Sequence, residues 1–96
     1  MIDRLGYGWE TIHAKYPKLI MASISGAGQN GPIYENSSDH YGYDLIAQGM
    51  TGLMSIVGDK DNTVPLKAGI EIGDTVSGIY LSNGICAALY KRERSG

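Results

Sequence analysis

Asp74 is the carboxylate whose place in the sequence best suits a chemical role. It follows a short segment of alternating apolar residues, 66–73, and precedes a long apolar stretch that begins at Thr75. If these are a strand and a helix, Asp74 lies at the carboxyl edge of a sheet, where open α/β folds bind ligands. Helix capping is the more frequent role of an aspartate in this position. The pattern alone leaves both roles open.

A glycine motif and an acidic run resemble known binding sites but depart from them. Residues 26–31 have the G-x-G-x-x-G spacing of a dinucleotide-binding turn, but Pro32 and a polar loop follow where that turn needs a helix. Residues 59–62 resemble the start of a calcium loop, yet Val64 stands where the turn glycine belongs. A plain glycine loop and a solvated turn are the favoured interpretations.

Histidine and cysteine are too sparse for a metal centre or a nucleophile pair. His13, His40 and Cys86 lie far apart in the sequence, and no serine stands in a G-x-S-x-G motif. We therefore expect no bound metal. A single cysteine cannot form an internal disulfide, which favours a reducing, cytoplasmic location.

The spacing of apolar residues predicts which elements position Asp74. The predicted elements are a helix over residues 5–16, a strand over 19–24, a helix over 44–54 capped by Asp44, a strand over 66–73, and a helix from Thr75 to about Arg94. This order predicts an α/β fold, a partial Rossmann-like parallel sheet with flanking helices. Two strands do not make a stable sheet. We therefore expect residues 1–96 to form a single partial domain, with further strands supplied by another copy or by additional sequence.

The charge balance argues against nucleic acid or membrane partners. Eight Lys and Arg residues stand against ten Asp and Glu residues, for a net charge of -2. Such a chain carries no electrostatic footprint for an anionic polymer or surface. No apolar run approaches the length of a membrane span. Small molecules and other proteins are the expected partners.

Motifs spread along almost the whole chain carry a family resemblance. They occupy residues 3–8, 17–20, 23–32, 42–48, 73–74, 84–89 and 92–94. Together and in this order they resemble the class III CoA-transferases, which include formyl-CoA and carnitine CoA-transferases and the related α-methylacyl-CoA racemases. The resemblance implies that the chain is the N-terminal half of the family's large domain without its first strands. It also implies coenzyme A as the acyl-CoA co-substrate, a carboxylic acid as the acceptor, and a homodimer or higher homo-oligomer.

The same resemblance assigns roles to individual residues. Asp74 matches the family's nucleophile, which forms a mixed anhydride with the acyl group and then an aspartyl-CoA thioester. Arg4 matches a residue that contacts the nucleotide part of CoA, and Leu5 would pack beside it. Tyr43 matches a position that lines the active site. Because the racemases have a His-Asp pair where this chain has Tyr43-Asp44, CoA transfer is favoured over racemisation of 2-methylacyl-CoA.

Departures from the family pattern leave an alternative open. Family members are several times longer, and the chain lacks their small domain and the glycine-rich loop expected further along. Residues 33–41 also look longer than is typical. We therefore expect the isolated 96-residue chain to be inactive. The alternative function is that of a non-catalytic, truncated remnant that folds by self-association.

Overall fold

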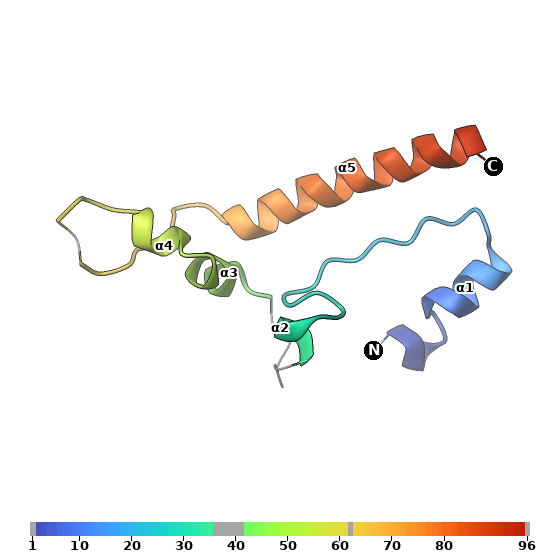
Figure 1. Cartoon of the computed structure of the whole chain (residues 1–96), viewed down its shortest axis with the longest axis horizontal. Helices are drawn as coiled ribbons and strands as arrows, with labels where there is room; N and C mark the ends of the chain where they lie inside the picture. Colours follow the sequence, from blue (N-terminus) through green and yellow to red (C-terminus); the bar gives the residue numbers. More distant parts are fainter. Residues whose placement is uncertain (1, 36–41, 62, 96) are drawn as a thin grey trace. The chain divides into compact units, whose positions relative to one another are not determined.

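The computed structural model describes residues 2–35, 42–61 and 63–95. In chain order the described elements are the 3-10 helix η1 (Ile2–Leu5) and the α-helices α1 (Trp9–Lys15), α2 (Pro32–Glu35), α3 (Asp44–Met50), α4 (Leu53–Ile56) and α5 (Ile72–Ser95), as labelled in Figure 1. They belong to two compact units. One unit comprises Met1–Ser23 with Leu81–Gly96, and the other comprises Ile24–Tyr80.

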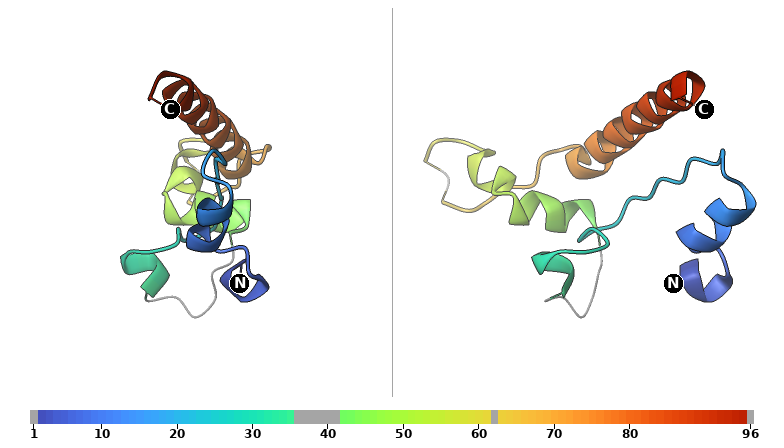
Figure 2. Two further views of the ribbon diagram at one scale, coloured as in Figure 1. Left: turned by 90° about the vertical axis from the view of Figure 1, so that its right-hand side faces the viewer. Right: turned by 45° about the vertical axis from the view of Figure 1, so that its right-hand side comes forward.

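The predicted parallel sheet is wrong, because the described residues contain helices and no β-strand. Residues 19–24 lie instead in the irregular stretch between α1 and α2, drawn in light blue in Figure 2. An apolar run of this kind becomes a strand only when a neighbouring strand completes its hydrogen-bond ladder. No other part of the described chain offers residues 19–24 such a neighbour.

The second predicted strand, over residues 66–73, is also wrong, and its hydrogen bonds show why. The N–H of Leu66 donates to the C=O of Met54 at 3.1 Å, and the side chain of Gln48 bonds to the backbone of Ala68 and of Ile70. The backbone groups of this segment are thus occupied by a helical turn and a side-chain amide. From Ile72 onward the chain is already helical, three residues before the predicted start of the long helix.

In the unit Met1–Ser23 with Leu81–Gly96, the helix predicted over residues 5–16 is shorter than expected, because α1 begins at Trp9 and η1 before it ends at Leu5. Within α1 the rings of Trp9 and His13 stack, with centroids 4.4 Å apart. Near the end of α5, Arg92 donates from Nη1 to the C=O of Lys18 at 3.0 Å. This bond ties the last turns of α5 to the turn that follows α1.

In the unit Ile24–Tyr80, the first glycine of the predicted glycine motif, Gly26, lies close to Gly42. A Cβ added to Gly42 would lie 2.5 Å from the Cα and 2.7 Å from the backbone N of Gly26. The two backbones therefore approach each other as closely as only glycine permits. The short helix α2 follows the glycine motif directly, where the sequence predicted only loop.

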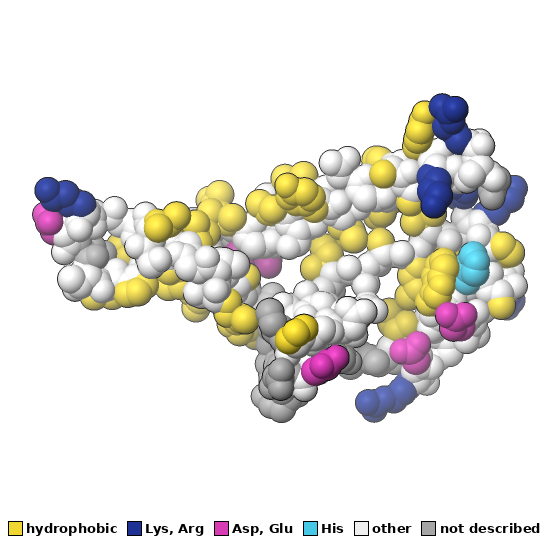
Figure 3. Space-filling view, viewed as in Figure 1, with side chains coloured by type: hydrophobic (Ala, Val, Ile, Leu, Met, Phe, Trp, Pro, Cys, Tyr) yellow, Lys and Arg dark blue, Asp and Glu magenta, His cyan; other side chains and the backbone are white. Residues whose placement is uncertain are grey.

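The most buried side chains of the described chain are polar. Asp44 is 6% exposed and Gln48 only 1%, whereas none of the described apolar side chains is buried. Apolar side chains are exposed along α5 (Figure 3). Val76, Ile79 and Tyr80 are among the exposed apolar residues of this helix. Hydrogen bonding, rather than an apolar core, therefore dominates the packing around Asp44 and Gln48. None of the described helices has the length and apolar character to cross a membrane.

Candidate functional site

Asp74 lies in the first turn of α5, the longest described helix, as its third residue. Its side chain is exposed, and within the described chain its carboxylate makes no hydrogen bond or ion pair. A capping residue precedes the first helical residue, so a position inside the helix does not fit the capping interpretation of Asp74. Asp74 is accordingly an exposed carboxylate in the first turn of a helix, without a partner among the residues that the structure describes.

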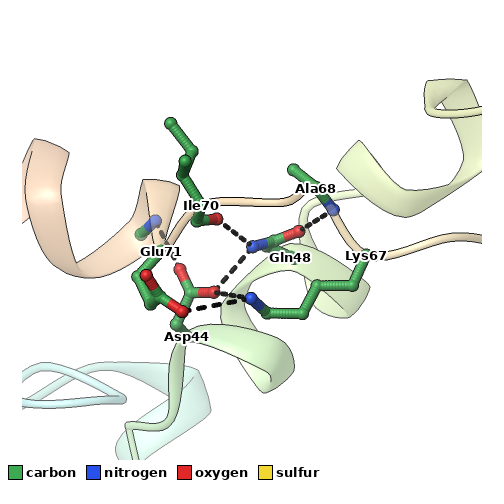
Figure 4. Close-up of polar contacts among 7 residues, drawn as sticks. Asp44, Gln48, Lys67, Ala68, Ile70 and Glu71 are labelled. Atoms are coloured by element: carbon green, nitrogen blue, oxygen red, sulfur yellow. Dashed lines mark hydrogen bonds and ion pairs between the residues drawn. The ribbon is translucent and has the colours of Figure 1, made fainter.

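Asp44 holds the first turn of α5 from the neighbouring helix α3. The backbone N–H of Gly73 donates to Oδ1 of Asp44 at 2.7 Å (Figure 4). The sequence predicted that Asp44 caps its own helix, but Tyr43 is the N-cap of α3 and Asp44 is its first helical residue. The Asp44 carboxylate instead satisfies one of the N–H groups that α5 leaves free at its start. Its negative charge is also favourable at the positive end of the α5 dipole.

Gln48 lies one turn after Asp44 and links it to the segment that leads into α5. Its Nε2 donates to Oδ2 of Asp44 at 2.6 Å and to the C=O of Ile70 at 3.2 Å. Its Oε1 accepts from the N–H of Ala68 at 2.9 Å. Figure 4 shows the amide between the Asp44 carboxylate and the backbone of residues 68–70. The segment before α5 is therefore attached to α3 through one side chain.

Lys67 supplies the positive charge closest to the buried Asp44. Its Nζ lies 3.8 Å from Oδ2 of Asp44 and 3.4 Å from Oε1 of Glu71. The pair with Glu71 is exposed, and exposed ion pairs contribute little to stability. The nearness of Lys67 to Asp44 matters more, because a buried carboxylate is costly unless it is hydrogen-bonded and paired.

Gly73 allows α3 and α5 to meet at this point. A Cβ on Gly73 would lie 3.0 Å from Oδ1 of Asp44 and 3.2 Å from Cβ of Ala47. Both distances are tighter than ordinary van der Waals contact. Asp44 is fixed by several bonds and Ala47 by its helix, so neither atom can yield easily. A residue without a side chain is therefore needed just before Asp74.

The other residues predicted for the site fall in both compact units. Tyr43 and Asp74 are the sequence neighbours of Asp44 and Gly73, which are joined by the hydrogen bond described above. The Tyr43 side chain is exposed. Arg4 and Leu5 lie in η1, in the other unit, and both side chains are exposed there.

The sequence did not predict the roles of Gln48 and Lys67. A signal for Gln48 was available, because Asp44 and Gln48 are spaced four residues apart and so share one helix face. Nothing comparable marks Lys67. Of the residues weighed for a metal, His13 stacks on Trp9, Cys86 is exposed, and His40 lies outside the described residues. The described part of the chain brings no three His, Cys, Asp or Glu side chains together as a metal site.

Comparison of the amino-acid sequence with known proteins identifies the family to which the chain belongs. The model of CoA-transferase family III matches residues 1–96. The chain is 45% identical over 95 residues to the succinate–glutarate CoA-transferase of Agrobacterium fabrum, 42% over 95 residues to the formyl-CoA:oxalate CoA-transferase of Streptomyces avermitilis, and 40% over 97 residues to the acetyl-CoA:oxalate CoA-transferase of Acetobacter aceti. These matches cover 99%, 99% and 100% of this chain but only 22%, 22% and 24% of the relatives. No solved structure matches.

Proposed function

Because the chain belongs to CoA-transferase family III, we propose that it carries the nucleophile of an enzyme that moves CoA from an acyl-CoA to a carboxylic acid. The family predicted from the sequence is thereby confirmed. One observation supports the proposed chemistry above all others. Asp74 presents an exposed carboxylate, without a partner among the described residues, on a helix turn that Asp44 holds in place.

The proposed reaction begins with the carboxylate of Asp74 as the nucleophile. One carboxylate oxygen attacks the thioester carbonyl, the C–S bond breaks, and CoA leaves as a thiolate. The thiolate then attacks the Asp74 carbonyl of the mixed anhydride, which releases the donor acid and leaves an aspartyl-CoA thioester. The acceptor carboxylate repeats these two steps in reverse and regenerates Asp74. This is covalent catalysis without a need for a separate base to activate the nucleophile.

The start of α5 would stabilise the oxyanion that forms at each attack. The N–H of Ile72 donates to the C=O of Ile70 at 3.0 Å, and the N–H of Gly73 donates to Asp44. That leaves the N–H of Asp74 as the candidate donor in this turn, supported by the positive end of the helix dipole.

The similar proteins point to an acceptor class. Their names specify succinate, glutarate and oxalate, all of them dicarboxylic acids. We take a small dicarboxylic acid as the acceptor class for this enzyme as well. Racemisation of 2-methylacyl-CoA is not favoured, since these relatives are transferases and Tyr43 replaces the histidine expected in racemases. The homo-oligomer, the cytoplasmic location and the place of the chain within the large domain stay predictions.

Covalent trapping tests the proposed nucleophile. Incubation of the complete enzyme, rather than of the isolated 96-residue chain, with an acyl-CoA and then hydroxylamine should convert the aspartyl thioester into a hydroxamate on Asp74, detected by peptide mass spectrometry. Buried Asp44 serves as the internal control and should stay unmodified, as should Asp74 when acyl-CoA is omitted. Modification of a different carboxylate, or none while substrate is being turned over, would refute the role of Asp74.

Arg4 is the residue proposed to bind the nucleotide part of CoA, with Leu5 packed beside it and Tyr43 lining the active site. A hydrogen bond to a charged group is worth about 1.5–3 kcal/mol. Arg4→Ala should therefore raise the KM for acyl-CoA roughly 10- to 100-fold with little change in kcat, as measured by steady-state kinetics. Arg94→Ala removes another exposed arginine and should leave KM unchanged. Equal KM values for the Arg4 and Arg94 variants would argue against the contact.

A further inference from the structure

The side-chain amide of Gln48 is buried and fully engaged in hydrogen bonds to its neighbours. It is 1% exposed, and its amide makes the two donated and one accepted bonds described above. A buried polar group is tolerated when its hydrogen bonds are made and is costly when they are lost.

The partners of Gln48 lie on the path that leads to Asp74. Ala68 and Ile70 belong to the segment just before α5, and Asp44 binds Gly73 within the first turn. We propose that Gln48 is a positioning residue, whose amide holds this segment and the Asp44 carboxylate so that the turn carrying Asp74 stays fixed. The proposal depends on the proposed function of Asp74 as the nucleophile. A displacement of about 1 Å in such a group can cost about 10²-fold in rate.

The geometry requires an amide at residue 48 rather than a carboxylate. Oδ2 of Asp44 lies 2.6 Å from Nε2, and the C=O of Ile70 is a second acceptor for the same nitrogen. A glutamate of the same shape would place an oxygen against both acceptors and would set two carboxylates together in a buried position. The positive charge of Lys67, whose Nζ lies 3.8 Å from Oδ2 of Asp44, could offset only part of that repulsion.

Two near-isosteric substitutions in the intact protein test the proposal. Gln48→Glu should lower kcat by about 10²-fold while leaving the KM for acyl-CoA nearly unchanged. Hydrogen exchange at the Gly73 amide should become at least about tenfold faster, because Asp44 is pushed away from it. Gln48→Met, which removes the amide without adding charge, should instead speed exchange at Ala68 and lower kcat less. If Gln48→Glu does not fold, the exchange rate at Ala68 and the kcat of Gln48→Met decide whether the proposal holds.

A double variant that exchanges the carboxylate and the amide between residues 44 and 48, the reversed pair, tests whether the hydrogen bond itself positions the turn. In Asp44→Asn/Gln48→Glu, the asparagine N–H can donate to the new carboxylate while its oxygen still accepts from Gly73. The double variant should recover part of kcat and part of the Gly73 protection relative to Gln48→Glu. Asn83→Asp adds the same charge at an exposed position of α5 and should change neither measurement.

The outcomes distinguish this proposal from the proposed function. Wild-type kcat and Gly73 exchange in Gln48→Glu would overturn the positioning role, and so would a reversed pair no better than Gln48→Glu alone. If hydroxylamine fails to trap Asp74, the nucleophile assignment fails instead. The exchange rates at Gly73 and Ala68 would then still decide whether Gln48 holds this turn.

Discussion

Asp74→Asn should lower the kcat of CoA transfer by about 10⁴-fold or more. The amide is nearly the same size and keeps the start of α5 unchanged, but it cannot form the anhydride or the CoA thioester. In a well-studied hydrolase, single removals from the covalent catalytic group cost about 10⁴ to 10⁶ in kcat. Steady-state assays with a purified acyl-CoA and a dicarboxylic acceptor would measure the loss.

The control for Asp74→Asn is Asp61→Asn. Asp61 is an exposed aspartate in the same compact unit, so its substitution makes the same chemical change away from the helix start. It should retain wild-type kcat. Because an asparagine can deamidate back to aspartate, Asp74→Ala should be assayed beside it. Transfer within tenfold of wild type in both Asp74 variants would exclude Asp74 as the nucleophile.

Gly73→Ala should lower kcat by about 10²-fold, with smaller changes in KM. The added methyl group meets Oδ1 of Asp44 and Cβ of Ala47 at 3.0 and 3.2 Å. Since both neighbours are held in α3, the first turn of α5 must shift instead, and Asp74 shifts with it. Overpacking of this kind also destabilises by about 1–3 kcal/mol, which thermal unfolding of the variant would show.

Gly78→Ala is the matched control, because it makes the same change one turn later in the same helix. A Cβ at Gly78 would meet nothing within 4 Å. Alanine is about 0.8–1.0 kcal/mol better than glycine inside a helix, so this variant should be slightly more stable and fully active. If Gly73→Ala behaved in the same way, the close approach of α3 and α5 would not matter for activity.

Residue spacing predicted the helices better than it predicted the fold class. The apolar pattern found helical structure around α1, α3 and α5, although α5 begins at Ile72 rather than Thr75. It failed for residues 66–73, where alternation is equally compatible with a strand and with an extended segment beside a helix. What decides between them is the Gln48 side chain, which bonds to Ala68 and Ile70, 20 and 22 residues away. Local periodicity carries no information about such a contact.

The candidate site was predicted only in part, because some of its contacts join residues that are far apart in the sequence. Asp74 could be identified because it adjoins a glycine at the start of a helix and matches a family motif. The support around it arises from the contact between Asp44 and Gly73, which are 29 residues apart. Sequence spacing places Asp44 and Gln48 on one face of α3, but it does not show which part of the chain that face contacts.

The close contact between Gly26 and Gly42 has a consequence for how this region can change over evolution. Because Gly26 and Gly42 lie this close together, doubling the length of the chain between them would cost only about 0.6 kcal/mol of loop-closure entropy. We therefore expect insertions and deletions between the two glycines to leave Tyr43 and the start of α3 in place. Changes in length between the two glycines would then not shift the helix turn that carries Asp74.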